Sequence, residues 1–265
     1  MLNSLTSVIA RLVWFFNPHK LYFFRIISSL SFGIAEPRRV MARRFFYTPT
    51  RYEMNKVTFI VDGFNLYHTL KRAHKPPHNK ASRWLDLTTL CSHCLPIIGK
   101  ETKLSGVYYI SALASHLKRT NPGVTVRHQN YIRCLEDSGV TVRLNRFKKK
   151  SVWCHNCQTK ILKHEEKETD VMLATTLFEL FYTNVCDTAV LVTGDTDLAP
   201  AITTGKRLFP DKRIIFAFPF GTQTSDMKKL APGSFSLSPD MYAKAQFPDP
   251  FTLSDGSVIT KPERW

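Results

Sequence analysis

The sequence predicts an α/β domain built on a parallel β-sheet, and three observations support this prediction. From residue 56 onward, runs of β-branched and aromatic residues alternate with stretches of helical periodicity, as in βαβ units. The chain has 265 residues, 43% of them hydrophobic, which is enough to bury one substantial core with some additional segments. Acidic residues directly follow predicted strands, and the carboxyl ends of the strands are where a doubly wound sheet binds its ligands.

The first half of the domain is expected to contain two strands and two helices. Gly63 ends the first strand, VTFIV, and a polar, basic loop separates the first helix from the second. Asp86 is a suitable N-cap for the second helix, because its carboxylate accepts hydrogen bonds from free backbone N–H groups. In chain order, the expected elements are a strand at 57–61, helices at 65–72 and 86–97, and a strand at 107–112.

The second half is expected to continue the same alternation. Asn121-Pro122 is typical of a helix start and Ser138-Gly139 of a helix end. The next twenty residues, which include WCHNC, are interpreted as a charged loop. ETDVMLATTLFELFYT has the apolar spacing of a core-packed helix. In chain order, the expected elements are a helix at 122–137, a strand at 140–147, a helix at 168–183 and strands at 189–193 and 213–218.

The formal charge of +16 makes nucleic acid or an anionic membrane surface the first partners to consider. Residues 1–53 hold eight Lys or Arg against two acids, a net charge of +6. The remaining residues therefore carry +10 and are basic as well. No apolar run in this N-terminal extension reaches the roughly 20 residues of a membrane helix, and no stable span is expected. A targeting sequence, an interfacial anchor and a translation start at Met41 or Met54 all stay compatible with it.

Three acidic sites are positioned to meet at one edge of the predicted sheet. Asp62 ends the first strand in VDGFN, Asp195 and Asp197 follow the fourth in VTGDTD, and Gly63 and Gly194 are expected to let the backbone turn beside them. Asp170 lies in the first turn of a helix, where the dipole favours negative charge. A strand order of 3-2-1-4-5 would bring these carboxylates together. Because such carboxylates repel one another, the cluster predicts a site for Mg²⁺ or Mn²⁺ rather than zinc.

Paired divalent ions at such a site would support hydrolysis of a phosphodiester bond. Taken singly, each aspartate also has a simpler explanation as a turn former or a helix cap. Asp197 would cap the helix that begins at Leu198, although Thr196 is the better candidate for that cap. Asn65 either caps the first helix or orients Asp62 and a water molecule.

Three motifs, VDGFNLYH, EEKETDVMLATTL and VTGDTDLAP, occur in this order and together resemble the NYN domain family of PIN-like, LabA-like proteins. The resemblance implies a Rossmann-like, three-layer fold at 54–245, between the extension at 1–53 and a C-terminal arm at 246–265 that either packs on the surface or is mobile. It also implies a metal-dependent (Mg²⁺ or Mn²⁺) ribonuclease site. Its acidic ligands would be Asp62, Asp170, Asp195 and Asp197, with Asn65 beside them and Thr193 where similar proteins often carry serine.

Two basic regions are candidates for binding the RNA backbone, and both leave elements that border the predicted site. Histidines and aromatic residues such as Tyr67, His68 and Trp84 offer stacking surfaces for unpaired bases. The simpler interpretation of each region is a solvated basic face. The candidate RNA-binding residues are Lys71, Arg72, Lys75, Lys80 and Arg83 after the first helix, and Arg143, Arg146, Lys148, Lys149 and Lys150 around the third strand.

The six cysteines do not resemble the disulfide framework of a small secreted domain, which favours a reducing, cytoplasmic location. Cys154 and Cys157 form half of a zinc knuckle, with His164 as a third ligand. A redox pair and a loop without metal are the alternatives for this pair.

These patterns bear on three candidate functions. A metal-dependent endoribonuclease is favoured over an RNA-binding module without activity. A phosphatase lacks support, because VDGFN has no second acid two residues after its aspartate. A homo-oligomer is compatible with the sequence.

Overall fold

The computed structural model of the chain describes residues 54–78, 82–113, 115, 121–154, 156–166, 168–230, 233–263 and 265. The N-terminal extension at 1–53 and the candidate RNA-binding residue Lys80 lie outside the described residues, as does the side chain of His164. Within the described part of the chain, no helix has both the length and the apolar character needed to cross a membrane.

A seven-stranded sheet in the order β4-β3-β2-β1-β5-β6-β7 forms the centre of the domain. The five predicted strands pair with their neighbours in parallel and follow the predicted order 3-2-1-4-5, which is confirmed for these strands. The edge strands β4 and β7 (Gly233–Ser236) extend this order and were not predicted. The five predicted strands are β1 (Asn55–Asp62), β2 (Thr102–Leu113), β3 (Thr141–Cys154), β5 (Thr188–Val192) and β6 (Arg213–Phe218).

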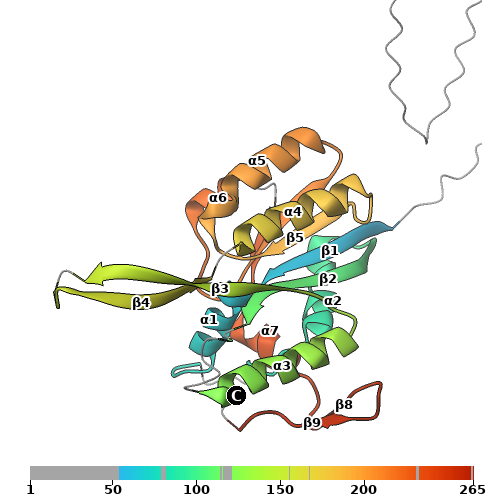
Figure 1. The fold of residues 1–265 in the computed structure, drawn as a ribbon. Coiled ribbons are helices and arrows are strands. Elements are labelled where there is room, and N and C mark those ends of the chain that lie inside the picture. Colours follow the sequence, from blue (N-terminus) through green and yellow to red (C-terminus); the bar gives the residue numbers. More distant parts are fainter. Residues whose placement is uncertain are drawn as a thin grey trace, which may run out of the picture. The chain divides into compact units, whose positions relative to one another are not determined.

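The segment after residue 147 is a long β-hairpin, and the prediction of a charged loop there was wrong. β3 continues to Cys154 and pairs antiparallel with β4 (Thr159–Glu166). This hairpin projects from the body of the domain (Figure 1). No residue of β3 after Asn145 is buried, so this part of the strand lacks the alternating buried face that marks a strand in sequence.

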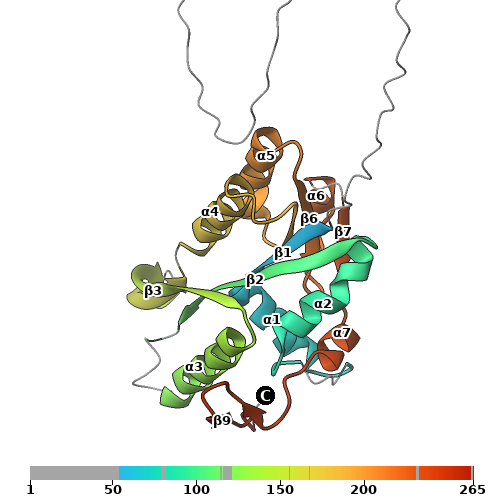
Figure 2. The same ribbon diagram turned by 90° about the vertical axis from the view of Figure 1, so that its right-hand side faces the viewer.

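Helices cover both faces of the sheet and complete a three-layer domain (Figures 1 and 2). Successive strand residues serve opposite layers, because side chains alternate across a sheet: Phe59 and Val61 belong to one apolar cluster and Ile60 to the other. One face carries α1 (Gly63–Ala73), α2 (Leu87–Ile98), α3 (Pro122–Asp137) and α7 (Pro239–Lys244), and the other carries α4 (Thr169–Tyr182), α5 (Ala199–Leu208) and α6 (Ser225–Leu230).

The C-terminal segment packs onto the domain, so of the two expectations for this arm the structure shows the packed one. It contains a small antiparallel pair, β8 (Phe251–Thr252) and β9 (Val258–Ile259). The indole N–H of Trp84 donates to the carbonyl of Pro248 at 3.1 Å. The Trp265 ring lies 5.4 Å from the ring of Tyr131, centroid to centroid. The arm thereby adds apolar side chains to the core beneath α3.

Candidate metal centre at the carboxyl edge of the sheet

The site begins with two polar residues at the ends of neighbouring strands. Asp62 ends β1 and Thr193 follows β5, and the two strands pair in parallel with Val61 opposite Val192. The Thr193 hydroxyl donates to Asp62 Oδ2 at 3.0 Å. Both residues are buried, with exposed fractions of 0% for Thr193 and 4% for Asp62. Parallel pairing therefore joins residues that are 131 positions apart in sequence.

Asp62 also begins the first helix, because its Oδ1 accepts from the backbone N–H of Asn65 at 2.9 Å. Asp62, not Asn65, is thus the cap of α1. The side-chain oxygen of Asn65 is buried and has no hydrogen-bond partner among the described residues. A buried amide oxygen in this position can accept a hydrogen bond from water or coordinate a hard cation.

Asp195 joins this network through Thr193. The backbone N–H of Asp195 donates to the Thr193 hydroxyl at 3.1 Å, so this hydroxyl connects the two aspartates. Asp195 Oδ1 accepts from the N–H of Asp197 at 3.0 Å and caps the short 3₁₀ helix Thr196–Leu198 that leads into α5. The sequence-based preference for Thr196 as the cap was therefore wrong.

Asp170 faces the same negative charges from the first turn of α4. Its pKa is raised, first because the surrounding protein desolvates the carboxyl group of this otherwise exposed residue, and second because Asp195 and Asp197 are negative. The side-chain amide of Asn145 in β3 donates to the hydroxyl of Thr169 at 3.2 Å. This contact fixes the start of α4 against the sheet and so positions Asp170.

The two glycines beside the aspartates are required by close packing rather than by the turn conformation that the sequence suggested. Neither Gly63 nor Gly194 has a positive φ angle. A Cβ atom on Gly63 would lie 2.5 Å from the ring of Tyr109, and one on Gly194 would lie 2.5 Å from Thr222. Any larger residue at either position would displace these side chains from the edge of the sheet.

The candidate metal-ligand atoms at this edge are all oxygens, which suits Mg²⁺ or Mn²⁺. Within the part of the chain that the structure describes, no three His, Cys, Asp or Glu side chains are close enough to surround one ion. Mg²⁺ needs fewer than three protein side chains, because it keeps several waters and binds through one or two carboxylates together with substrate phosphates. The mutual repulsion at Asp170 and the buried oxygen of Asn65 are both features that a hard cation would relieve, so the residues fit such an ion.

The candidate zinc ligands lie far along the projecting hairpin. Cys154 ends β3, and the exposed thiol of Cys157 lies 2.9 Å from the hydroxyl of Thr159. Among the described side chains no third metal-binding residue joins this pair. The other four cysteines, Cys91, Cys94, Cys134 and Cys186, are buried in the body of the domain.

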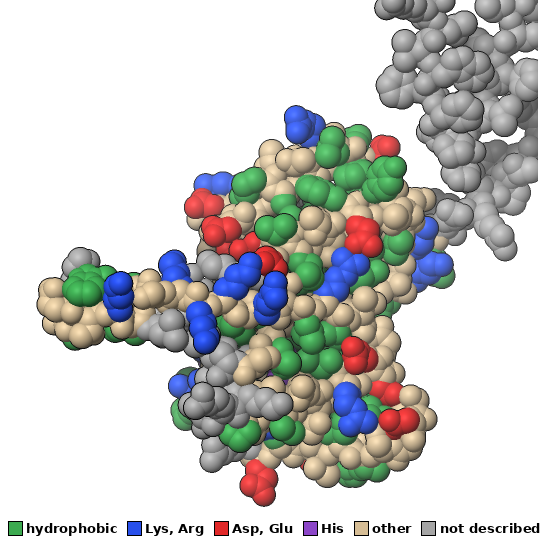
Figure 3. Space-filling model, in the orientation of Figure 1, with side chains coloured by type: hydrophobic (Ala, Val, Ile, Leu, Met, Phe, Trp, Pro, Cys, Tyr) green, Lys and Arg blue, Asp and Glu red, His purple; other side chains and the backbone are tan. Residues whose placement is uncertain are grey.

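The second basic region extends along the hairpin. Lys148 forms an ion pair with Glu168, the residue before α4, so the base of the hairpin adjoins the helix that carries Asp170. Figure 3 shows Lys and Arg side chains along the hairpin next to a group of acidic side chains on the body. Arg143 does not belong to this surface, because it pairs with Glu179 at 2.9 Å. The members on the described hairpin are Arg146, Lys148, Lys149 and Lys150.

The first basic region is divided between two places. Lys71 and Arg72 lie in the last turn of α1, and exposed Lys75 follows the helix. Arg72 donates to the carbonyl of Phe220 at 3.3 Å, in the turn whose Thr222 packs against Gly194. Arg83 is half-buried and lines a cavity on the α1 side of the sheet.

The sequence patterns did not reveal that cavity. It has a volume of about 360 Å³ and is lined by residues of α1, β2, β3, α3 and the C-terminus. Trp265 and Phe147 both contribute to its wall although they are far apart in sequence. No local pattern marks such a cavity, because the lining assembles only when these segments fold together.

Comparison with known proteins gives a match between residues 56–236 and the model of the NYN domain. A 6-hydroxy-3-succinoylpyridine 3-monooxygenase from Pseudomonas putida is 28% identical over 170 residues, which cover 54% of this chain and 53% of that protein. The chain thus spans about half the length of this curated relative. A crystal structure of a protein of unknown function from Vibrio parahaemolyticus is similar with a TM-score of 0.48 and 13% identity, over 71% of this chain and 96% of that one.

Proposed function

The chain belongs to the NYN domain family, and on this premise we propose that it is a metal-dependent ribonuclease that hydrolyses RNA phosphodiester bonds. The family lies within the PIN-like nuclease superfamily, whose members typically use divalent metal ions. One observation supports the proposal above the others: the Thr193 hydroxyl links Asp62 to Asp195 at the carboxyl edge of the sheet. Ligands and substrates of parallel α/β sheets bind at this edge.

The proposed ligands for Mg²⁺ or Mn²⁺ are Asp62, Asp170, Asp195 and Asp197. Bound ions of this kind supply an activated water and neutralise the charge of the leaving oxygen. Thr193 holds the carboxylate of Asp62 in one orientation through its donated hydrogen bond. The buried oxygen of Asn65 is available to accept a hydrogen bond from a water molecule at this edge. In this proposal the protein contributes position and charge rather than a covalent intermediate.

The basic hairpin is the proposed binding surface for the RNA backbone. Exposed lysines attract phosphates without regard to sequence, since they neutralise backbone charge and release counterions. The ion pair between Lys148 and Glu168 keeps the base of the hairpin beside α4. An RNA strand that follows the hairpin would therefore lead toward Asp170.

An RNA-binding module without cleavage is the second candidate function. The observation in its favour is that no three potential ligand side chains among the described residues are gathered around one point. The oxidation named for the Pseudomonas relative is not carried over to this chain, because the match covers about half of each protein at 28% identity.

The test is cleavage of labelled single-stranded RNA by the purified full-length chain in Mn²⁺ and in EDTA. The variants are Asp195→Asn and, as a matched control, Asp211→Asn, which alters an exposed aspartate before β6. Activity that requires Mn²⁺, is lost in Asp195→Asn and is kept in Asp211→Asn supports the nuclease. Binding without cleavage under any metal supports the module, and cleavage that persists in EDTA contradicts the proposed metal centre.

A further inference from the structure

The cavity of about 360 Å³ beside α1 has the size of a binding site for one small molecule. Its wall includes Gly63, which directly follows Asp62 in the chain. One wall of the cavity is therefore adjacent in sequence to a candidate metal ligand, and the cavity lies on the face of the sheet that carries α1 and α3. We call it the aromatic cavity.

Six of the residues that line it are Phe, Tyr or Trp. Phe64 and Tyr67 line the cavity from the start of α1 with exposed fractions of 43% and 44%, so both rings are accessible to a ligand. The ring of Tyr131 on α3 contacts the rings of Tyr109 and Trp265, with centroid distances of 6.3 and 5.4 Å. Walls of this kind suit a flat ring, because stacking requires only a planar π surface.

The polar groups of the aromatic cavity are cationic or neutral. Arg83 and Arg127 line it, and among its described lining residues there is no Asp or Glu. His128 also lines it, and burial lowers the pKa of this imidazole, so at neutral pH one ring nitrogen donates and the other accepts. This combination favours a planar ligand that is neutral or negatively charged and that offers both donors and acceptors.

A nucleotide meets each of these requirements. Its base is planar and carries donors and acceptors on one edge, and its phosphate is negative. We propose that the aromatic cavity binds one unpaired nucleobase of the RNA whose adjoining phosphate lies at the candidate metal centre. This inference rests on the proposed function and narrows its substrate to single-stranded RNA, because a base within a duplex is not available to enter a cavity.

The test measures binding separately from cleavage. Isothermal titration calorimetry in EDTA compares the four ribonucleoside 5′-monophosphates with ribose 5-phosphate, which lacks the base, on the full-length chain. At least one nucleotide is expected to bind about tenfold more tightly than ribose 5-phosphate, in line with the usual contribution of base stacking. Tyr67→Ala is expected to remove about tenfold of that affinity. This side chain is 44% exposed, so its loss leaves the core intact.

Tyr182→Ala is the matched control, because Tyr182 is 84% exposed at the end of α4, on the opposite face of the sheet. It should bind nucleotides like the wild type. If Tyr67→Ala fails to fold, Tyr67→Leu removes the ring with less loss of volume. Equal binding of ribose 5-phosphate and nucleotides, or nucleotide binding that is unchanged in both Tyr67 variants, would overturn the inference.

Cleavage of RNA with Mn²⁺ is then measured on the same preparations. Cleavage without base-dependent binding leaves the nuclease proposal standing and refutes the base site. Base-dependent binding that is sensitive to Tyr67, without cleavage under any metal, keeps the base site and refutes the nuclease. The two proposals can therefore fail independently.

Discussion

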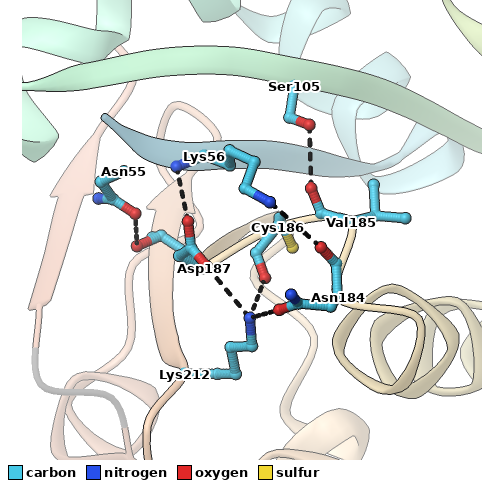
Figure 4. A network of polar contacts seen from close by, with 9 residues as sticks. Asn55, Lys56, Ser105, Asn184, Val185, Cys186, Asp187 and Lys212 are labelled. Carbon is cyan, nitrogen blue, oxygen red and sulfur yellow. Dashed lines mark hydrogen bonds and ion pairs between the residues drawn. The ribbon is translucent and has the colours of Figure 1, made fainter. Parts of the chain in front are cut away.

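Aspartates at the two ends of the same parallel sheet have neighbours of opposite charge. At the amino-terminal end, Asp187 accepts from the backbone N–H of Lys56 at 3.0 Å and from the ammonium group of Lys212 at 3.1 Å (Figure 4). Lys212 also donates to the carbonyl of Cys186 at 2.8 Å. At the carboxyl end, the charges that act on Asp170 are those of Asp195 and Asp197, and both are negative.

The pKa values of these carboxyl groups move in opposite directions. Burial alone would raise the pKa of Asp187, but the hydrogen bonds from Lys56 and Lys212 outweigh it and lower the pKa. Desolvation and neighbouring carboxylates raise the pKa of Asp170. The chain supplies its own counter-charge at one end, where the residues stabilise the fold. The other end carries an electrostatic cost that is typical of functional sites.

The largest expected effect is on catalysis. Asp170→Asn should lower Mn²⁺-dependent RNA cleavage on the order of 100-fold, because a charged group at the reacting centre is lost. Asp187→Asn should leave cleavage unchanged. Single-turnover assays with both variants give the comparison, and equal losses in the two would show that the ends of the sheet do not differ in function.

The next effect is on stability. Lys212→Met should lower the free energy of unfolding by about 2 kcal/mol, because charged hydrogen bonds to Asp187 and to a backbone carbonyl are lost. The Lys212 side chain is only 14% exposed, so water replaces these bonds poorly. Urea denaturation measures the change. Wild-type stability in this variant would show that the amino-terminal network contributes little.

A smaller effect is expected from metal binding. At ten times its dissociation constant, Mn²⁺ should stabilise the folded protein by roughly 1.4 kcal/mol, since it binds the native state alone. Thermal unfolding with and without Mn²⁺ measures this gain, which Asp170→Asn should reduce and Lys212→Met should retain. A gain that is equal in wild type and Asp170→Asn would place the ion elsewhere.

The smallest effect is on pH dependence. The folded-state pKa of Asp187 lies below 3.8, so its stabilising contribution is present above that pH and is lost as the pH falls through the lower value. The folded-state pKa of Asp170 lies above 3.8. The protonated carboxyl group therefore favours folding in acid, and this stabilising contribution is lost as the pH rises through the raised, folded-state pKa.

At neutral pH, Asp187→Asn should therefore be less stable than the wild type, and Asp170→Asn should be equally or more stable. Each difference should be below about 1 kcal/mol, because both sites are partly exposed to solvent. Urea denaturation at neutral pH and below pH 3.8 measures both differences, which should shrink in acid as the wild-type carboxyl groups become protonated. Differences of the reverse sign would contradict the pKa shifts.

The part of the fold that the sequence predicted is the part that buries apolar strands. VTFIV and RIIFAF are marked by composition alone, because helices cover both faces of these strands. β3 has no buried residue after Asn145, and β7 has only four residues. These elements leave no apolar periodicity in the sequence to detect.

The site was predictable to the extent that it follows from strand order. Asp62 and Thr193 meet because β1 and β5 are neighbours, and the position of each at the end of a strand is visible in the sequence. The hydrogen-bond partners depend on side-chain geometry, so the cap at Asp195 and the unpartnered oxygen of Asn65 were not foreseen. The aromatic cavity was missed because its walls come from separate segments.

The projecting hairpin places the proposed RNA contacts at a distance from the candidate metal centre. A strand rises about 3.3 Å per residue, so the part of β3 between Asn145 and Cys154 extends roughly 30 Å. A mononucleotide at the carboxyl edge is too short to contact the outer lysines, whereas a longer strand engages them one after another. The length of the polymer that is retained can therefore change through insertions or deletions in this arm while the aspartates stay where they are.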